Sequence, residues 1–171
     1  MGEVNFLLSA MCDSNFASEP GSKSRWGYFF FVGGALVSWT STHSTRIMSS
    51  STEAECHGLV HTGKENIWQR EFLDYLGCFE GKLGPTEIFQ DNTSAITLAT
   101  SGTKHKRSKH FGIEFDLFHE YVSLGEVQII YRNTNELAAD MLTKNLAPDK
   151  FAKFRDEVMG GEEIQMHFQS L

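Results

Sequence analysis

The stretch Gly27–Trp39, which reads GYFFFVGGALVSW, decides the class of fold. Aromatic and β-branched residues fill both of its halves, and Gly33-Gly34 separates them. This pattern is typical of two antiparallel strands joined by a tight turn. We therefore expect a β-hairpin with strands at Gly27–Val32 and Ala35–Thr40.

Outward from this hairpin, strand and helix patterns alternate. A short apolar run, Phe6–Cys12, predicts a strand before the hairpin, and the polar stretch Asp13–Lys23 predicts a loop. The elements expected after the hairpin are a helix at Ser49–Leu76, a strand at Glu87–Gln90, helices at Ser94–Thr100 and Ser108–Ser123, a strand at Glu126–Tyr131, a helix from Asn133–Glu136 to Pro148, and a last helix carrying Phe151, Phe154 and Val158. Three leading antiparallel strands followed by alternating units predict an α/β fold, a mixed sheet with helices on its faces.

The composition narrows the class of protein. A length of 171 residues favours one domain, and no apolar run approaches the roughly 18 residues of a membrane helix. No secretory signal is visible at the N-terminus. Cys12, Cys56 and Cys78 are odd in number and lack CxxC spacing, which argues for a reduced compartment and against a disulfide framework or a zinc site.

The charge is unevenly distributed. A net charge of −7 disfavours nucleic-acid binding unless the basic residues are concentrated in one place. One such place exists, because the run KHKRSKH at Lys104–His110 carries four formal positive charges in seven residues. This run fits either a solvated loop or a phosphate-binding segment.

Four acids stand at positions where α/β proteins gather functional sites. Asp13 follows the first strand, Glu55 lies in the first turn of the long helix, Asp91 follows the fourth strand, and Asp140 lies early in a later helix. Carboxylates without an accompanying Cys/His set favour magnesium or manganese over zinc. Two such ions about 3.5–4 Å apart would clamp the oxygens of a phosphodiester.

Each acid also has an ordinary structural interpretation. Asp13 fits an Asx-turn, Asp91 fits an N-cap, and Asp140 fits a helix surface. Glu55 closes a capping box with Thr52, unless the box forms one register earlier between Ser50 and Glu53. The spacing of the acids leaves these alternatives open.

Longer strings around the acids are more specific. SSSTEAEC, FQDNTSAI, KRSKH and LAADMLTK (Ser49–Cys56, Phe89–Ile96, Lys106–His110 and Leu137–Lys144) closely resemble the ribonuclease H domain of copia-type LTR retrotransposon polyproteins. CDSNFAS at Cys12–Ser18 and the Gly27–Trp39 hairpin fit the same family in the same order. The resemblance runs from about Leu7 to Val158, so we expect a ribonuclease H domain at 1–159 and leave the tail at 160–171 unassigned.

The resemblance implies the ribonuclease H-like fold, with a five-stranded mixed sheet flanked by helices. It also implies a metal-dependent endonuclease that hydrolyses the RNA strand of RNA–DNA hybrids during reverse transcription. The family's metal-binding and catalytic carboxylates fall on Asp13, Glu55, Asp91 and Asp140, which would hold two Mg²⁺ or Mn²⁺ ions. Asp13 would bridge both ions, Glu55 and Asp91 would hold the one nearer the leaving group, and Asp140 would hold the one that activates water.

The implied partners are the hybrid and the reverse transcriptase domain of the same polyprotein, with no membrane. The expected location is intracellular and cytoplasmic, or a virus-like particle where the element is active. The residues expected to contact nucleic acid are Ser14, Asn15, Asn92, Lys104, Lys106, Arg107 and Lys109. Asn92 fits a local turn cap equally well, and His110 fits a proton shuttle, a phosphate contact or a structural histidine.

The chain departs from the family at three places. Asn15 stands where a second Asp is usual, Thr42-His43-Ser44 replaces a common Lys-Lys-Gln stretch, and Cys56 replaces a Tyr. Two other functions stay open: an integrase- or resolvase-like DNA nuclease of the same fold, and a non-catalytic module that binds nucleic acid or protein. The motif strings disfavour the first, and the complete set of four acids disfavours the second.

Overall fold

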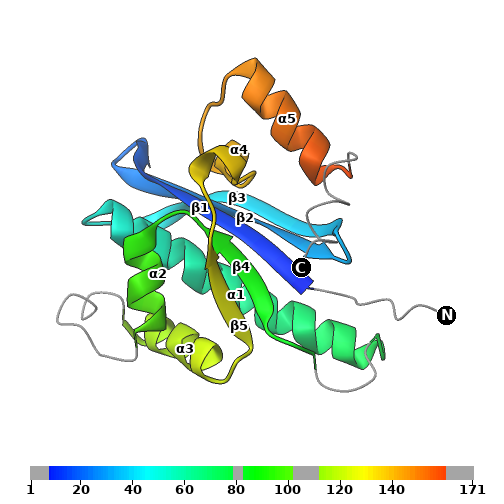
Figure 1. Cartoon of the computed structure of the whole chain (residues 1–171). Helices are drawn as coiled ribbons and strands as arrows, with labels where there is room; N and C mark the ends of the chain where they lie inside the picture. Colours follow the sequence, from blue (N-terminus) through cyan, green and yellow to red (C-terminus); the bar gives the residue numbers. More distant parts are fainter. Residues whose placement is uncertain (1–7, 79–82, 102–111, 161–171) are drawn as a thin grey trace.

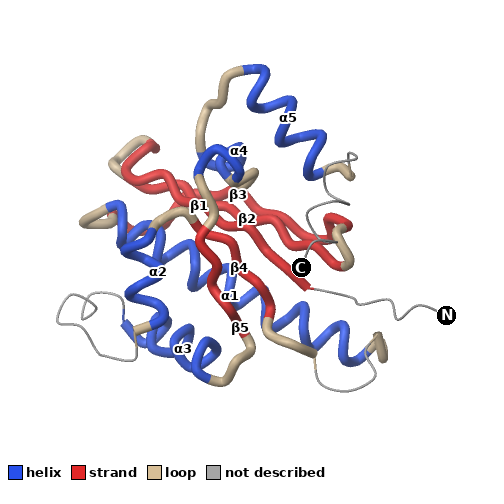
Figure 2. The backbone as a smooth tube through the Cα atoms, viewed as in Figure 1, coloured by secondary structure: helices blue, strands red, loops and turns tan. Residues whose placement is uncertain are grey.

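The computed structural model describes residues 8–78, 83–101 and 112–160. A single sheet runs through the middle of the molecule, with helices on both of its faces (Figures 1 and 2). Its strands are β1 (Leu8–Glu19), β2 (Lys23–Val32), β3 (Ala35–Ile47), β4 (Thr86–Gln90) and β5 (Val127–Tyr131). Within the described residues, no helix combines the length and apolar character needed to cross a membrane.

The sheet has five strands in the order β3-β2-β1-β4-β5. β1, β2 and β3 pair antiparallel, whereas β4 runs parallel to both β1 and β5. The mixed sheet expected from the sequence is therefore confirmed, and so is the hairpin turn at Gly33-Gly34, where both glycines have positive φ.

Helices cover the two faces unequally (Figure 1). α1 (Ser51–Tyr75), α2 (Thr93–Thr100) and α3 (Gly112–Ser123) lie on one face, and α4 (Asp140–Thr143) and α5 (Pro148–Val158) lie on the other. Successive strand residues point to opposite faces. Tyr28 and Phe30 therefore enter the core under α1, while Phe29 and Phe31 enter the core under α4 and α5.

All three leading strands are longer than predicted, and β3 continues to Ile47 instead of ending at Thr40. β1 does not end at Cys12, since Asp13, Ser14 and Asn15 continue to pair with β2 and the strand reaches Glu19 through a register shift. The predicted loop shrinks to Pro20–Ser22 because β2 begins earlier than its aromatic residues suggested.

The helix expected from Asn133 onward is also broken. It consists of a 3-10 turn at Thr134–Glu136 and the single turn of α4. Between them Leu137, Ala138 and Ala139 are completely buried in the core under α4 and α5. This burial holds the segment close against the sheet. Pro148 opens α5 at its first turn, where a proline costs no hydrogen bond.

Candidate metal centre

The site lies where β1 and β4 separate. Their parallel pairing stops at Met11 and Phe89, after which β1 continues along β2 and β4 ends. Asp13 and Asp91 each come two residues after these last partners, so they reach the same edge of the sheet. Such a parting of neighbouring strands is where open α/β sheets bind ligands.

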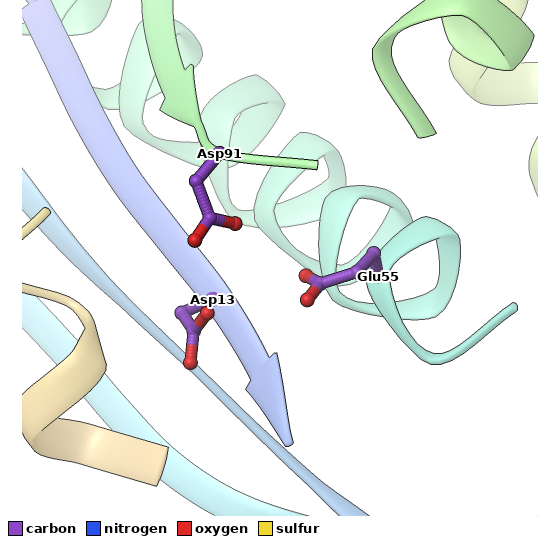
Figure 3. A group of neighbouring side chains, drawn as sticks. All are labelled: Asp13, Glu55 and Asp91. Atoms are coloured by element: carbon purple, nitrogen blue, oxygen red, sulfur yellow. The ribbon is translucent and has the colours of Figure 1, made fainter. Parts of the chain in front are cut away.

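The start of α1 supplies the third acid. Ser50 is the N-cap, because its side chain accepts a hydrogen bond from the backbone N–H of Glu53, and the Glu53 carboxylate accepts from the backbone N–H of Ser49. Of the two capping registers open from the sequence, the Ser50–Glu53 register forms. Glu55 is therefore not used for capping, and its carboxylate turns toward β1 and β4 (Figure 3).

Three carboxylates converge at this point. One oxygen each from Asp13, Glu55 and Asp91 lies within 4.8 Å of the others, and the first two side chains are buried (Figure 3). The short distances concentrate negative charge in a place from which water is largely excluded. Such an arrangement favours a bound cation, since buried like charges destabilise one another.

The acid–base properties of the group reflect this crowding. Burial raises the pKa of Asp13 to about 6, although Lys144 and Thr143 act in the opposite direction. Burial also raises the pKa of Glu55, and the charges of Asp13 and Asp91 raise it further. Protons and metal ions would therefore compete for the same oxygens.

Asp140 has a different environment from the other three acids. It is almost completely buried, and Lys144 Nζ lies 2.7 Å from its Oδ1 while Lys150 Nζ lies 3.1 Å from its Oδ2. Lys144 Nζ also lies 3.1 Å from Asp13 Oδ1. Asp140 is thus linked to Asp13, one of the three converging carboxylates, through a shared ammonium group.

Several neighbours of the acids were not identified from the sequence. The hydroxyl groups of Thr143 and Thr134 donate hydrogen bonds to Asp13 and Asp91, respectively. Lys144 had a detectable signal, because it follows Asp140 by four residues, the spacing at which helical side chains meet. Lys150 and Thr134 had none, since the turns that bring them to the site are tertiary features.

The predicted polar contacts lie in three different environments. The Ser14 hydroxyl is buried against Gly58 of α1, on the opposite side of β1 from Asp13, which gives it a packing position. Asn15 Nδ2 donates to the carbonyl of Thr143 at 3.1 Å and so ties β1 to α4. Asn92 Oδ1 accepts from the backbone N–H of Ala95, so Asn92 is the N-cap of α2.

The predicted basic segment lies outside the described residues. It comprises Lys104, Lys106, Arg107, Lys109 and His110, between α2 and α3. Their roles in binding nucleic acid stay predictions.

Comparisons with known proteins identify the relatives of the chain. No protein-family model matches it. The chain is 34% identical over 146 residues to the retrovirus-related Pol polyprotein from transposon TNT 1-94 of Nicotiana tabacum, and 30% identical over 152 residues to that from transposon RE1 of Arabidopsis thaliana. These alignments cover 85% and 88% of this chain but 11% and 10% of the relatives.

Solved structures share the fold at low sequence identity. A ribonuclease H1 isolated from compost by a metagenomic approach superposes with a TM-score of 0.60 at 14% identity, covering 80% of this chain and 92% of that one. The foamy viral protease-reverse transcriptase in complex with RNA/DNA hybrid gives 0.56 at 13% identity, covering 84% of this chain and 20% of that one. The homologues of this chain are therefore copia-type retrotransposon Pol polyproteins, and its fold is that of a ribonuclease H domain.

Proposed function

We propose that this chain is a metal-dependent ribonuclease H that hydrolyses the RNA strand of RNA–DNA hybrids during reverse transcription of a retrotransposon. The observation that carries the proposal is the convergence of Asp13, Glu55 and Asp91 at the parting of β1 and β4. A ribonuclease H fold with retrotransposon Pol relatives supports the assignment of this group to nuclease chemistry.

The donor set fits magnesium or manganese. All three converging groups are carboxylates, the hard oxygen ligands that these ions prefer. The nearby thiol of Cys12 is unsuited to metal binding, because burial raises its pKa and keeps it protonated. Asp13, Glu55 and Asp91 would hold one ion, and Asp13 with Asp140 would hold a second one after Lys144 has moved away.

Two bound divalent ions would stabilise the attacking and leaving oxygens of the scissile phosphodiester. The protein's own contribution is to orient the ligands. The hydroxyls of Thr143 and Thr134 fix Asp13 Oδ2 and Asp91 Oδ2, and Lys144 Nζ holds Asp13 Oδ1 at 3.1 Å. Lys144 and Lys150 each form an ion pair with Asp140, and Lys144 also pairs with Asp13.

We further propose that the substrate is recognised by its hybrid geometry. Groups near the cleaved strand would sense 2′-hydroxyls across the minor groove, and the amide nitrogen of Asn92 would make one such contact. The segment Lys104–His110 would bind phosphates. Four phosphate contacts predict a salt slope of only about −3 to −4, and therefore weak binding by the isolated chain.

Weak binding would be offset by a tethered partner. The relatives are Pol polyproteins much longer than this chain, and one structural neighbour is a protease-reverse transcriptase in complex with RNA/DNA hybrid. We propose that a reverse transcriptase domain of the same polyprotein raises the local concentration of the hybrid. The place of action would be intracellular, as for a retrotransposon polyprotein.

The test is a side-by-side cleavage assay on hybrid, duplex DNA and duplex RNA, with Mg²⁺ or Mn²⁺ and with EDTA. We expect cleavage of the RNA strand of the hybrid, leaving 3′-hydroxyl and 5′-phosphate ends, and complete loss of activity with EDTA. The same assay on a fusion to a reverse transcriptase should show a larger gain at low substrate than at saturation.

Two outcomes would contradict the proposal. Preferential cutting of duplex DNA would indicate an integrase-like nuclease. Hybrid binding without any cutting, in both the isolated chain and the fusion, would indicate a non-catalytic module.

A further inference from the structure

Gln90, the last residue of β4, is a buried polar side chain beside the carboxylates. It has no exposed surface. Burying a carboxamide destabilises a protein unless its donors and acceptor find partners. The partners that Gln90 finds therefore indicate why a polar residue occupies this position.

Among the described residues, every hydrogen-bond partner of the Gln90 side chain belongs to the site or adjoins it. Gln90 Nε2 donates to Glu55 Oε2 at 3.1 Å and lies 3.5 Å from Cys12 Sγ, next to Asp13. Its Oε1 accepts from the backbone N–H groups of Asp91 at 2.7 Å and Asn92 at 3.1 Å. One side chain thus contacts all three chain segments that supply the converging carboxylates.

These bonds affect Asp91 and Glu55 differently. The backbone N–H groups after β4 are satisfied by Gln90, and Asn92 caps α2 with its own side chain. The Asp91 carboxylate is therefore not needed to close this turn and stays directed toward Asp13 and Glu55. At Glu55, an amide holds one oxygen in place without adding a positive charge, so the negative charge remains for a cation.

We propose that Gln90 is a positioning residue of the metal centre. It orients the Glu55 carboxylate and the Asp91 turn relative to each other, and it does so without neutralising either acid. This inference deepens the proposed function and rests on it, since it takes the three carboxylates as ligands of a divalent ion.

The test compares Gln90→Met with a matched control, Gln69→Met. Gln69 lies on α1 and is also buried, and its Nε2 donates to Glu65 Oε1 at 2.9 Å. It lies about 20 Å along the helix from Glu55, given a rise of about 1.5 Å per residue. Each variant removes one amide–carboxylate hydrogen bond, and Gln90→Met also removes the bonds from the Asp91 and Asn92 N–H groups. Only Gln90 is at the site.

The readout is Mn²⁺ affinity, measured by calorimetry, together with the unfolding temperature in EDTA. Gln90→Met should weaken Mn²⁺ binding by about 10- to 100-fold, the usual effect of losing a partner that orients a metal ligand. Gln69→Met should lower the unfolding temperature and leave Mn²⁺ affinity unchanged. Gln90→Asn, which keeps an amide but is too short to reach Glu55 and the turn together, should also weaken Mn²⁺ binding.

A double-mutant cycle separates positioning from general destabilisation. In a Glu55→Gln background, Gln90→Met should weaken Mn²⁺ binding much less than in the wild type, because its main target is gone. If all three variants bind Mn²⁺ as tightly as the wild type does, the role of Gln90 is overturned and the proposed metal centre stands. A wild-type chain that binds no Mn²⁺ would overturn both the inference and the proposed metal centre.

Discussion

Two buried carboxylates of this molecule, Asp140 and Glu55, have partners of different charge. Asp140 is 1% exposed and forms ion pairs with Lys144 and Lys150. Glu55 is 6% exposed, and its carboxylate accepts a hydrogen bond from the neutral amide of Gln90. Similar burial therefore comes with two ion pairs at one acid and a neutral hydrogen bond at the other.

The difference shows where an external cation is needed. A buried charge that the chain neutralises itself is stable without a ligand, whereas one left with an amide stays ionised at low cost only when a cation supplies the opposite charge. Asp13 lies between these cases, because it shares Lys144 with Asp140 and burial still raises its pKa to about 6. Changing the charge of the acids or of the lysines beside them should therefore change metal binding and stability.

The largest effect is expected when an uncompensated acid loses its charge. Asp91→Asn should lower hybrid cleavage by about 10³-fold or more, beyond the 10- to 100-fold typical of residues that only support metal ligands. Stability should change little or rise, since carboxylate repulsion is relieved. Steady-state kinetics measures the cleavage rate, and urea unfolding measures the stability. The control is Asp74→Asn, which makes the same charge change at an exposed position. Near wild-type turnover would exclude Asp91 from the metal centre.

The next effect concerns pH. The pKa of Asp13 is raised from 3.8 to about 6, so between these values the folded protein binds a proton more tightly than the unfolded chain. The metal-free protein should therefore lose stability as the pH rises from about 4 to 7, by up to about 3 kcal/mol from this group. Urea unfolding in EDTA at several pH values tests this, and Mn²⁺ should restore stability at pH 7.

The control for the pH effect is Asp13→Asn, in which this contribution to the slope should disappear. The charge of Asp13 also raises the pKa of Glu55, so the difference between the two curves reports Asp13 together with its coupling to Glu55. Parallel curves of unfolding free energy against pH for the variant and the wild type would show that ionisation of Asp13 does not destabilise the fold.

A smaller effect is expected from the shared lysine. Lys144→Met removes the ammonium group between Asp13 and Asp140 and should strengthen Mn²⁺ binding by about tenfold, the effect of one partly screened charge pair. Lys150→Met, whose ammonium pairs with Asp140 alone, should strengthen it less. Calorimetry measures both affinities. Weaker binding in Lys144→Met would mean that the lysine supports the metal centre and does not compete for it.

The smallest effect under physiological conditions is expected away from the carboxylates. Charge reversal of Lys106 and Arg107 should weaken hybrid binding at low salt and reduce the salt slope by about 2, because two phosphate contacts are lost. The difference should shrink as salt rises, while Mn²⁺ affinity stays unchanged. Fluorescence anisotropy across a salt series measures it, and unchanged binding at low salt would identify the run as a solvated loop.

The sequence predicted the sheet well because its signals are local. The hairpin is encoded by Gly33-Gly34 between aromatic runs, and the α1 stripe by apolar residues at helical spacing. The extent of β1 was missed, since the residues after Cys12 are polar and belong to a strand only because β2 pairs with them. The helix before Pro148 was misjudged because burial of Leu137–Ala139 overrides their helical propensity.

The carboxylates were identified as a set, but their grouping was not. Residue spacing places Asp140 near the same edge as the others, yet only the folded chain shows Lys144 between it and Asp13. Gln90 carried no signal beyond its place before Asp91, because its bonds reach Glu55, which lies 35 residues away in the sequence. Compensation of charge is a tertiary property, and the motif strings do not encode it.

The most direct test of the central claim is a crystal structure of the chain with Mn²⁺, examined by anomalous scattering. We predict a peak between the converging carboxylates of Asp13, Glu55 and Asp91. A second peak near Asp140 should come with movement of Lys144 Nζ away from Asp13. Absence of manganese from the three-carboxylate group at saturating concentration, or manganese bound only at Asp140, would contradict the account.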